Sequence, residues 1–184
     1  MCGIALVLGA SIDREDHRRF DELALAISPR GESLEEERGD DGLLATSRLK
    51  IVDRDHAVQP WRDQSGRYSL CYNGEVFNFA ELANRLRFEG HALRSESDTE
   101  VVLESWLAWG VDALTEFRGE FAFCIVDHHD GSAFLARDPA GIKPLYFAHD
   151  PGLLWVASEI KALAGFGLRI EEVPPGHCGV ALQG

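Results

Sequence analysis

The sequence has no long apolar run and comparatively few basic residues. No stretch approaches the roughly 20 apolar residues that a helix needs to cross a bilayer, and the short run 4–8 is soon followed by acidic residues. The N-terminus lacks the basic region and long apolar core of a secretion signal. With 18 Lys and Arg against 31 Asp and Glu, the net charge of −13 argues against nucleic acid or an anionic membrane as partner. We therefore expect a cytoplasmic protein.

Cysteine is also sparse, and no spacing typical of a metal site is found. The four cysteines, Cys2, Cys71, Cys124 and Cys178, lie far apart and form no Cys-x-x-Cys pair. Without a secretion signal, this spacing favours free thiols over a disulfide framework. The pair His128–His129 stands in DHHDG between two apolar runs, which favours a hairpin turn over a metal site.

The chain does have the composition of one globular domain. Its 184 residues are 45% hydrophobic and 27% charged, which is enough for one substantial core. We find no linker, internal repeat or low-complexity segment. Apolar runs bounded by turn residues predict strands over 2–8, 43–52, 68–72, 121–127, 133–138, 145–149, 153–158 and 177–182. Helices are predicted over 13–27, 78–90, 97–110 and 159–164.

Polar residues mark the ends of these helices. Asp13 is expected to cap the first, and Asn78 with Glu81, and Ser97 with Glu100, form capping-box patterns. The acidic segment 32–42 is predicted as an exposed, charged loop. Several hairpins together with separate helices predict an α+β fold with largely antiparallel sheets.

The opening residues, MCGIALVLGA, place a cysteine directly behind the initiator methionine. Two interpretations are open. Cys2 is a small apolar residue that starts a buried strand, which position alone favours. Alternatively, removal of Met1 makes Cys2 the first residue of the mature chain, where it carries a thiol and a free α-amine.

Seven fragments in a fixed order decide between these interpretations. They are MCGI, RLKIVD, YNGEVFNF, SDTEVVL, FRGEFAFCIVD, RDPAGIKPLYF and ASEIKAL. Together they resemble the glutamine-hydrolysing domain of class II amidotransferases, and the asparagine synthetase type in particular. The resemblance covers nearly the whole chain. It implies the N-terminal-nucleophile hydrolase fold, a four-layer αββα sandwich with two mainly antiparallel sheets between helical layers.

The resemblance gives Cys2 a catalytic role. A thiol with a reference pKa of about 8.5 needs a base, and an α-amine with a reference pKa of about 7.7 can serve as one. Attack on a glutamine side-chain amide creates an oxyanion that needs fixed donors. By resemblance these are the Asn73 side chain and the Gly74 backbone N–H. The alternative is that Asn73-Gly74 is only a hairpin turn, the commonest use of that dipeptide.

A site that selects glutamine should also pair its α-carboxylate and α-ammonium. The resemblance assigns the carboxylate to Arg48, whose guanidinium forks to two oxygens, and the ammonium to Asp98. Glu75 is a second candidate, for the ammonium or for the amide group. The alternatives are a surface arginine and an aspartate favoured by the helix dipole. The resemblance also places a backbone stretch along the substrate, namely Leu49, Lys50, Ile51 and Val52.

The sequence departs from the family pattern after the first predicted helix. The family has His-Arg-Gly-Pro-Asp, where this chain has Ser28-Pro29-Arg30-Gly31-Glu32. Arg30 and Gly31 are retained, and Arg30 is expected to line the loop of the nucleophile and to belong to the catalytic residues. Glu96 also stands where the family usually has glycine.

These residues predict that the chain, as one domain over 1–184, hydrolyses L-glutamine to glutamate and ammonia. The chain has no phosphate-binding loop or ATP pyrophosphatase motif. We therefore expect no cofactor here, with ATP and Mg²⁺ only on a synthetase portion, either further along a longer chain or on a separate subunit. A homodimer is possible. The alternatives are a catalytically silent assembly or regulatory domain, and an N-terminal-cysteine hydrolase of another amide.

Overall fold

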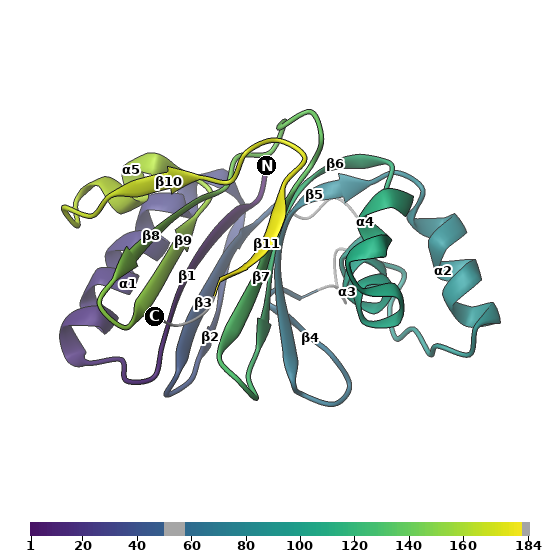
Figure 1. The fold of residues 1–184 in the computed structure, drawn as a ribbon, viewed down its shortest axis with the longest axis horizontal. Coiled ribbons are helices and arrows are strands. Elements are labelled where there is room, and N and C mark those ends of the chain that lie inside the picture. Colours follow the sequence, from purple (N-terminus) through teal and green to yellow (C-terminus); the bar gives the residue numbers. More distant parts are fainter. Residues whose placement is uncertain (50–57, 182–184) are drawn as a thin grey trace.

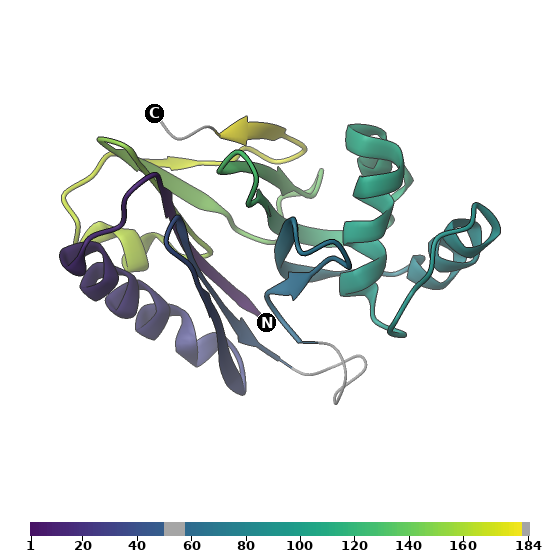
Figure 2. The same cartoon turned by 90° about the horizontal axis from the view of Figure 1, so that it is seen from below.

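Two antiparallel β-sheets lie face to face between two layers of helices (Figures 1 and 2). The computed structural model describes residues 1–49 and 58–181. In order of hydrogen-bonded neighbours, the six-stranded sheet contains β10 (Ile170–Glu172), β8 (Tyr146–Asp150), β9 (Leu153–Ala157), β1 (Gly3–Gly9), β3 (Gly42–Arg48) and β2 (Ser33–Arg38). The five-stranded sheet contains β11 (Cys178–Ala181), β7 (Ser132–Arg137), β6 (Gly119–Asp127), β5 (Tyr68–Val76) and β4 (Trp61–Arg62).

The helices divide between the two outer faces of this sandwich. The six-stranded sheet is covered by α1 (Arg14–Ile27) and α5 (Ile160–Ala164) (Figure 1). The five-stranded sheet is covered by α2 (Phe79–Phe88), α3 (Asp98–Trp109) and α4 (Ala113–Glu116). The 3₁₀ turns are η1 (Ser28–Arg30) and η2 (Gly110–Asp112). The predicted α+β, four-layer αββα architecture is confirmed.

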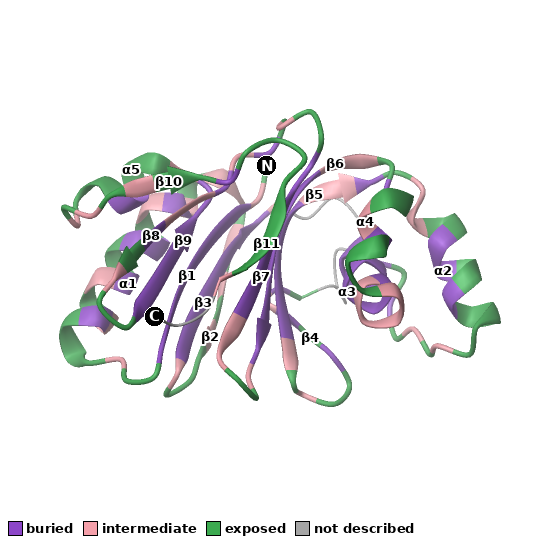
Figure 3. Ribbon diagram, viewed as in Figure 1, coloured by how far each residue is buried: buried purple, intermediate pink, exposed green. Residues whose placement is uncertain are grey.

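Strand β1 shows why the interior forms three apolar layers. Its alternate residues Ile4, Leu6 and Leu8 face the second sheet, whereas Ala5 and Val7 face α1. Because both faces of the strand are covered, it reads as an unbroken apolar run. Figure 3 shows the same burial along most of the central strands, whereas exposed residues lie on the outer helical faces, at the turns and along the edge strand β11.

Helix α1 forms as its sequence predicts. The Asp13 side chain accepts from the backbone of Asp16, and the Asp16 side chain accepts from the backbone of Asp13, which makes a complete capping box. The predicted apolar face is buried against the six-stranded sheet and comprises Phe20, Leu23, Ala24 and Ile27.

The two other predicted capping boxes are wrong. The amide of Asn78 bonds to the carbonyl of Glu116 and the N–H of Arg118, so it ties α2 to the start of β6 instead of capping the helix. Ser97 does cap α3 through the N–H of Thr99, but the Glu100 carboxylate accepts from Arg94 and Ser95. At Asn78 a distant partner has replaced the local one, whereas at Glu100 the partners lie in the segment just before the helix cap.

The predicted charged loop 32–42 is also wrong, because Ser33–Arg38 forms the edge strand β2. Its acidic residues point alternately to solvent and to polar groups on or near the other sheet. Glu35 accepts from the N–H of Gln59 at 2.8 Å, and Glu37 accepts from the hydroxyl of Ser69 at 2.9 Å. These contacts allow a charged sequence to form a strand.

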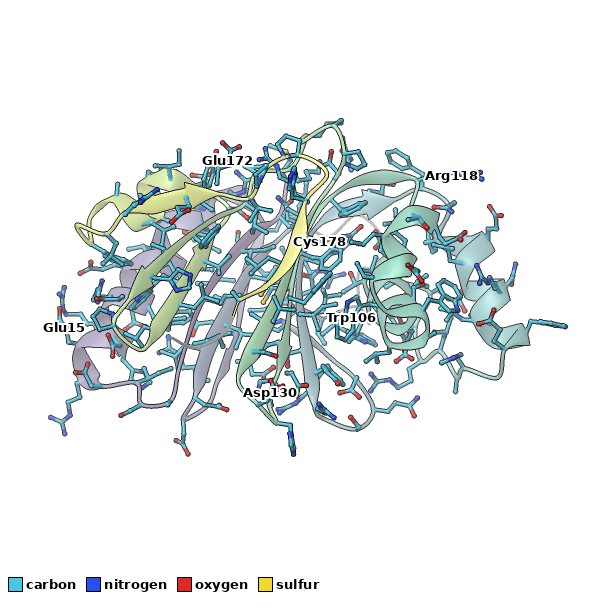
Figure 4. All side chains as sticks on the ribbon, in the orientation of Figure 1. Glu15, Trp106, Arg118, Asp130, Glu172 and Cys178 are labelled. Atoms are coloured by element: carbon cyan, nitrogen blue, oxygen red, sulfur yellow. The ribbon has the colours of Figure 1, made fainter. Side chains whose placement is uncertain are left out.

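The four cysteines, all of them within the described residues, have free thiols. Cys71 and Cys124 lie opposite each other on β5 and β6 within the core between the sheets, where burial raises the pKa of Cys71 to about 12. Cys178 is exposed on β11 (Figure 4). Cys2 stands just before β1, beside a cavity.

Candidate active site

The cavity lies where the start of β1 meets β5 of the opposite sheet. Its lining comes from both sheets, from the N-terminus of α3 and from the loop before β8: Met1, Cys2, Arg48, Leu49, Gln59, Tyr72, Asn73, Gly74, Glu75, Ser97, Asp98, Thr99, Glu120 and Lys143. The motifs quoted from the sequence are far apart along the chain, and the fold brings most of them to this one place.

The thiol of Cys2 is held at the cavity wall by backbone groups. The N–H of Leu49 donates to the sulfur at 3.3 Å, and the sulfur lies 3.9 Å from the carbonyl oxygen of the same residue. Arg30 donates from Nε to the carbonyl oxygen of Cys2 at 2.7 Å. A Cβ at Gly3 would lie 2.8 Å from Cδ of Arg30, so glycine is needed there for the arginine to approach.

Gly31 connects the altered SPRGE loop to the predicted substrate-binding strand. A Cβ at this position would lie within 2.6 Å of the backbone of Arg48. The next residue, Glu32, donates its N–H to the Arg48 carbonyl at 2.8 Å. Of the retained pair, Arg30 thus packs against Cys2, and Gly31 packs against Arg48.

Asn73 and Gly74 do not form a turn. They lie within β5, in register with Ala122 and Phe121 of β6, which excludes the hairpin-turn alternative. Asn73 is 1% exposed, and its Nδ2 has no hydrogen-bond partner in the described part of the chain. A buried amide donor without a partner is costly unless a ligand pairs with it. Its place in the cavity wall fits the predicted oxyanion donor.

Gly74 is required by the neighbouring strand. A Cβ at this position would lie 2.4 Å from the carbonyl oxygen of Glu120. Gly119 has the reciprocal contact, at 2.1 Å from the carbonyl oxygen of Glu75. The two strands therefore approach closely at the cavity wall, where the predicted oxyanion site lies.

Asp98 lies in the first turn of α3 and is 6% exposed. The hydroxyl of Tyr72 donates to its Oδ2 at 2.8 Å, and the N–H of Val76 donates to the same oxygen at 3.3 Å. Burial raises the pKa of Asp98 above its ordinary value, although these hydrogen bonds oppose the shift. A buried carboxylate with a raised pKa favours a cationic partner, which the α-ammonium of an amino acid supplies.

Arg48 and Glu75 line the same cavity, from β3 and β5 respectively. Arg48 is 5% exposed, so its charge is largely withdrawn from solvent. Among the buried charged residues of the cavity wall, Arg48 and Asp98 supply opposite charges, as the recognition of a zwitterionic head group requires. Lys50, Ile51 and Val52, also predicted to bind substrate, lie outside the described residues.

Arg30, predicted as a catalytic residue, does not line the cavity. It lies behind Cys2, where its Nη1 pairs with Glu159 at 2.7 Å. Its position supports the nucleophile, and no contact places it against the space for a substrate. Its predicted role in the reaction stays a prediction.

Several lining residues were missed by sequence analysis. Gln59 accepts from the N–H of Tyr72 at 3.0 Å and donates to the hydroxyl of Thr99 at 3.2 Å, so it connects β5 to α3 across the cavity wall. Lys143 pairs with Glu120 at 2.6 Å. Tyr72, Thr99, Glu120 and Lys143 all stand in the quoted motifs, but a motif does not indicate which side chains point inward.

Within residues 1–49 and 58–181, no group of three or more His, Cys, Asp or Glu side chains is placed to hold a metal ion. His128, from the DHHDG turn, instead contacts Ser69 at 2.8 Å and Glu37 at 3.3 Å. No helix in the same part of the chain is long and apolar enough to cross a membrane.

Known proteins resemble this chain in sequence and in fold. The family model described as "Glutamine amidotransferase domain" matches residues 1–174. Asparagine synthetase [glutamine-hydrolyzing] 1 of Arabidopsis thaliana is 35% identical over 180 residues, covering 96% of this chain and 30% of that protein. A putative asparagine synthetase [glutamine-hydrolyzing] of Mycobacterium bovis is 41% identical over 122 residues, covering 64% of this chain and 19% of that protein.

A solved structure confirms the fold. Glutamine phosphoribosylpyrophosphate amidotransferase from B. subtilis, complexed with ADP and GMP, superposes with a TM-score of 0.77 at 20% identity, covering 97% of this chain and 47% of that one. The chain spans about a third of the length of the plant relatives it matches. Because the family model covers all but the last ten residues, the chain belongs to the glutamine amidotransferase domain family.

Proposed function

We propose that this domain hydrolyses the side-chain amide of L-glutamine with the Cys2 thiol as nucleophile. One observation carries the proposal: the thiol, the unpartnered amide donor of Asn73 and the buried carboxylate of Asp98 line one cavity. Membership of the glutamine amidotransferase domain family supports the same substrate.

In the proposed reaction, the α-amine of processed Cys2 accepts the thiol proton. The thiolate attacks the amide carbon of glutamine, and the carbonyl oxygen becomes an oxyanion that accepts hydrogen bonds from Asn73 Nδ2 and the Gly74 N–H. The α-ammonium of Cys2 then returns a proton to the departing nitrogen, and ammonia leaves. Water attacks the resulting thioester, which frees glutamate and restores the thiol.

The head group of the substrate is held away from the reacting amide. Arg48 pairs with the α-carboxylate, and Asp98 pairs with the α-ammonium, with Glu75 available nearby. Because both charges of glutamine are matched by buried groups, an amide without an amino-acid head group would leave them unpaired. The backbone of Leu49, and by prediction of residues 50–52, completes the substrate-binding stretch.

We further propose an ATP-dependent synthetase domain or subunit as the consumer of the ammonia. The relatives are named glutamine-hydrolysing asparagine synthetases, and this chain spans about a third of their length. ATP and Mg²⁺ would bind to that synthetase portion, whereas the hydrolysis of glutamine requires neither. The acceptor of the ammonia is set by that portion.

Release of ammonia and glutamate from a panel of amides tests the proposal. Wild-type protein without Met1 is compared with Cys2→Ala on glutamine, asparagine and a glutamine analogue that lacks the α-amino group. We expect release from glutamine alone, and none with Cys2→Ala. Release from an amide without the head group would indicate another amidohydrolase. Inactivity on every amide, also in the presence of a synthetase partner, would indicate a silent domain.

A further inference from the structure

The ASEIKAL motif contains a glutamate that the proposed reaction does not use. Glu159 follows β9 and accepts a hydrogen bond from Nη1 of Arg30 at 2.7 Å. The same guanidinium donates from Nε to the Cys2 carbonyl at 2.7 Å. An ionic chain therefore runs from Glu159 through Arg30 to the backbone of the nucleophile.

Cys2 needs such support because it lies beyond the strand ladder. β1 pairs with β9 only from Ala5, opposite Ala157. One residue nearer the N-terminus, Ile4 exchanges two hydrogen bonds of 2.9 Å with the hydroxyl and the N–H of Ser158. At Cys2 the corresponding partner is Arg30, held by Glu159. Ser158 and Glu159 of the motif thus support the start of β1 beyond the last residue pair that joins it to β9.

The orientation of Arg30 depends on few contacts. Its side chain is 11% exposed, and its Nη2 is buried with no hydrogen-bond partner in the described part of the chain. Its guanidinium bonds to the carbonyl oxygen of Cys2 and to the carboxylate of Glu159. Loss of Glu159 would leave a mostly buried cation without its counter-charge, and such a group reorients toward solvent or another anion. The hydrogen bond to Cys2 would then be lost.

We propose that Glu159 is a positioning residue for the nucleophile, acting through Arg30 on the Cys2 backbone. This inference rests on the proposed function. Because thiol and α-amine belong to one residue, a rotation of its backbone moves nucleophile and base together relative to the substrate amide. The head-group contacts come from other elements and are unaffected. Disruption of the ionic chain from Glu159 through Arg30 therefore lowers turnover and leaves substrate binding intact.

Steady-state hydrolysis of glutamine by Glu159 variants tests the proposal. Glu159→Ala is expected to lower kcat by about 10- to 100-fold with KM changed less than about twofold. Glu159→Gln keeps an acceptor oxygen for Arg30 and is expected to retain most of the activity. The matched control is Lys161→Ala, which removes the other ionic partner of Glu159, at 2.7 Å, from a side chain that is 62% exposed. Wild-type kcat in Glu159→Ala would overturn the proposal.

A double-mutant cycle distinguishes positioning from a general loss of stability. If Glu159 acts through Arg30, Glu159→Ala causes no further loss of kcat in an Arg30→Met background. Independent losses that multiply would overturn the relay. Thermal unfolding of each variant gives the folded fraction by which kcat is corrected, and Glu159→Gln covers the case in which Glu159→Ala does not fold.

A measurement independent of activity separates this inference from the proposed function. In protein labelled with ¹³C at the cysteine carbonyls, the Cys2 signal is assigned by its absence in Cys2→Ser. We expect this signal to shift in Glu159→Ala and to stay in place in Lys161→Ala. An unchanged Cys2 signal would overturn the positioning role. If the wild type fails to hydrolyse glutamine, the proposed function fails. The Cys2 signal still shows whether Glu159 affects the hydrogen bond from Arg30 to the Cys2 carbonyl.

Discussion

The hydroxyl of Tyr72 donates a 2.8 Å hydrogen bond to Oδ2 of Asp98, and the two residues are only 2% and 6% exposed. Burial raises the pKa of the carboxyl, and the bond from Tyr72 opposes that rise. Tyr72 therefore helps to keep Asp98 ionised until the substrate ammonium arrives. A protonated Asp98 could not pair with that ammonium, so glutamine affinity should fall as the pH falls through the pKa of Asp98.

Tyr72→Phe removes this hydrogen bond without changing the ring. We expect the pKa of Asp98 to rise further, so the loss of glutamine affinity on the acid side should begin at a higher pH. The measurement is the Kd of glutamine from about pH 4.5 to about pH 8 in a Cys2→Ala background, where no proton transfer from the thiol contributes to the profile. Tyr146→Phe, the same change on β8, is the control. A pH dependence of glutamine affinity that stays unchanged in Tyr72→Phe would remove Tyr72 from this role.

Asn73→Ala removes the unpartnered amide donor of the cavity wall. The donor is expected to act on the charge that develops during the reaction, so the variant should lose about 100- to 1,000-fold in kcat with little change in KM. Steady-state kinetics on glutamine measure both constants. A raised KM with wild-type kcat would show that Asn73 binds the ground state instead.

Arg48→Ala should have the opposite signature. The guanidinium is expected to pair with a carboxylate whose charge is the same in substrate and transition state, so its loss raises KM more than it lowers kcat. Comparison with glutaminamide, which lacks the α-carboxylate charge, provides the control: wild type and Arg48→Ala should differ little on that substrate. An equal loss on both substrates would contradict the pairing.

The fold was largely predictable because its hairpins are local. The apolar runs of β6 and β7, and of β8 and β9, flank short polar turns, and α1 has a complete capping box and one apolar face. The missed strand β2 and the missed role of Asn78 are long-range effects. β2 is a strand because Glu35 and Glu37 find partners on or near the other sheet, and Asn78 bonds to residues close to 40 positions away. No local pattern carries that information.

The candidate site was likewise predictable only in part. Cys2, Asn73, Arg48 and Asp98 were predicted from motifs, and the structure brings them to one cavity. Asn73-Gly74 shows the limit of prediction from local sequence, because this dipeptide favours a turn and yet lies in the middle of β5. Gln59 was missed because its role depends on contacts with Tyr72 and Thr99 that form only in the folded chain.

Glu37 provides a pH-dependent tie between the two sheets. It lies on β2, and its carboxylate contacts Ser69 of β5 at 2.9 Å and His128 at 3.3 Å. Burial acts to raise the pKa of Glu37, but the hydrogen bonds from His128 and Ser69 outweigh it, and the pKa is lowered. Because the folded pKa lies below the unfolded one, the resulting stability is present above about pH 4.3 and is lost as the pH falls through the folded pKa.

Glu37→Gln should therefore lower the free energy of unfolding by about 1 kcal/mol at pH 7, and by less near pH 3. Urea unfolding at both pH values measures the difference. Glu36→Gln is the control, since Glu36 points to solvent on the same strand and pairs with Arg38 at the surface. An equal loss at both pH values would show that the charge of Glu37 is not involved.

The last prediction concerns Met1, which is 60% exposed and lines the cavity beside Cys2. An amide bond from Met1 removes the α-amine of Cys2, and a peptide N–H cannot accept the thiol proton at neutral pH. We expect the Met1-bearing form to release ammonia from glutamine at least about 100-fold more slowly than the processed form, the usual contribution of a general base. Treating one preparation with methionine aminopeptidase gives both forms, and intact mass distinguishes them by one methionine residue. Iodoacetamide should still label Cys2 in the unprocessed form, which shows that the thiol is present, and Cys2→Ala should be inactive with or without Met1. Equal hydrolysis by the two forms would exclude the α-amine as the base and require a separate one among the residues that line the cavity.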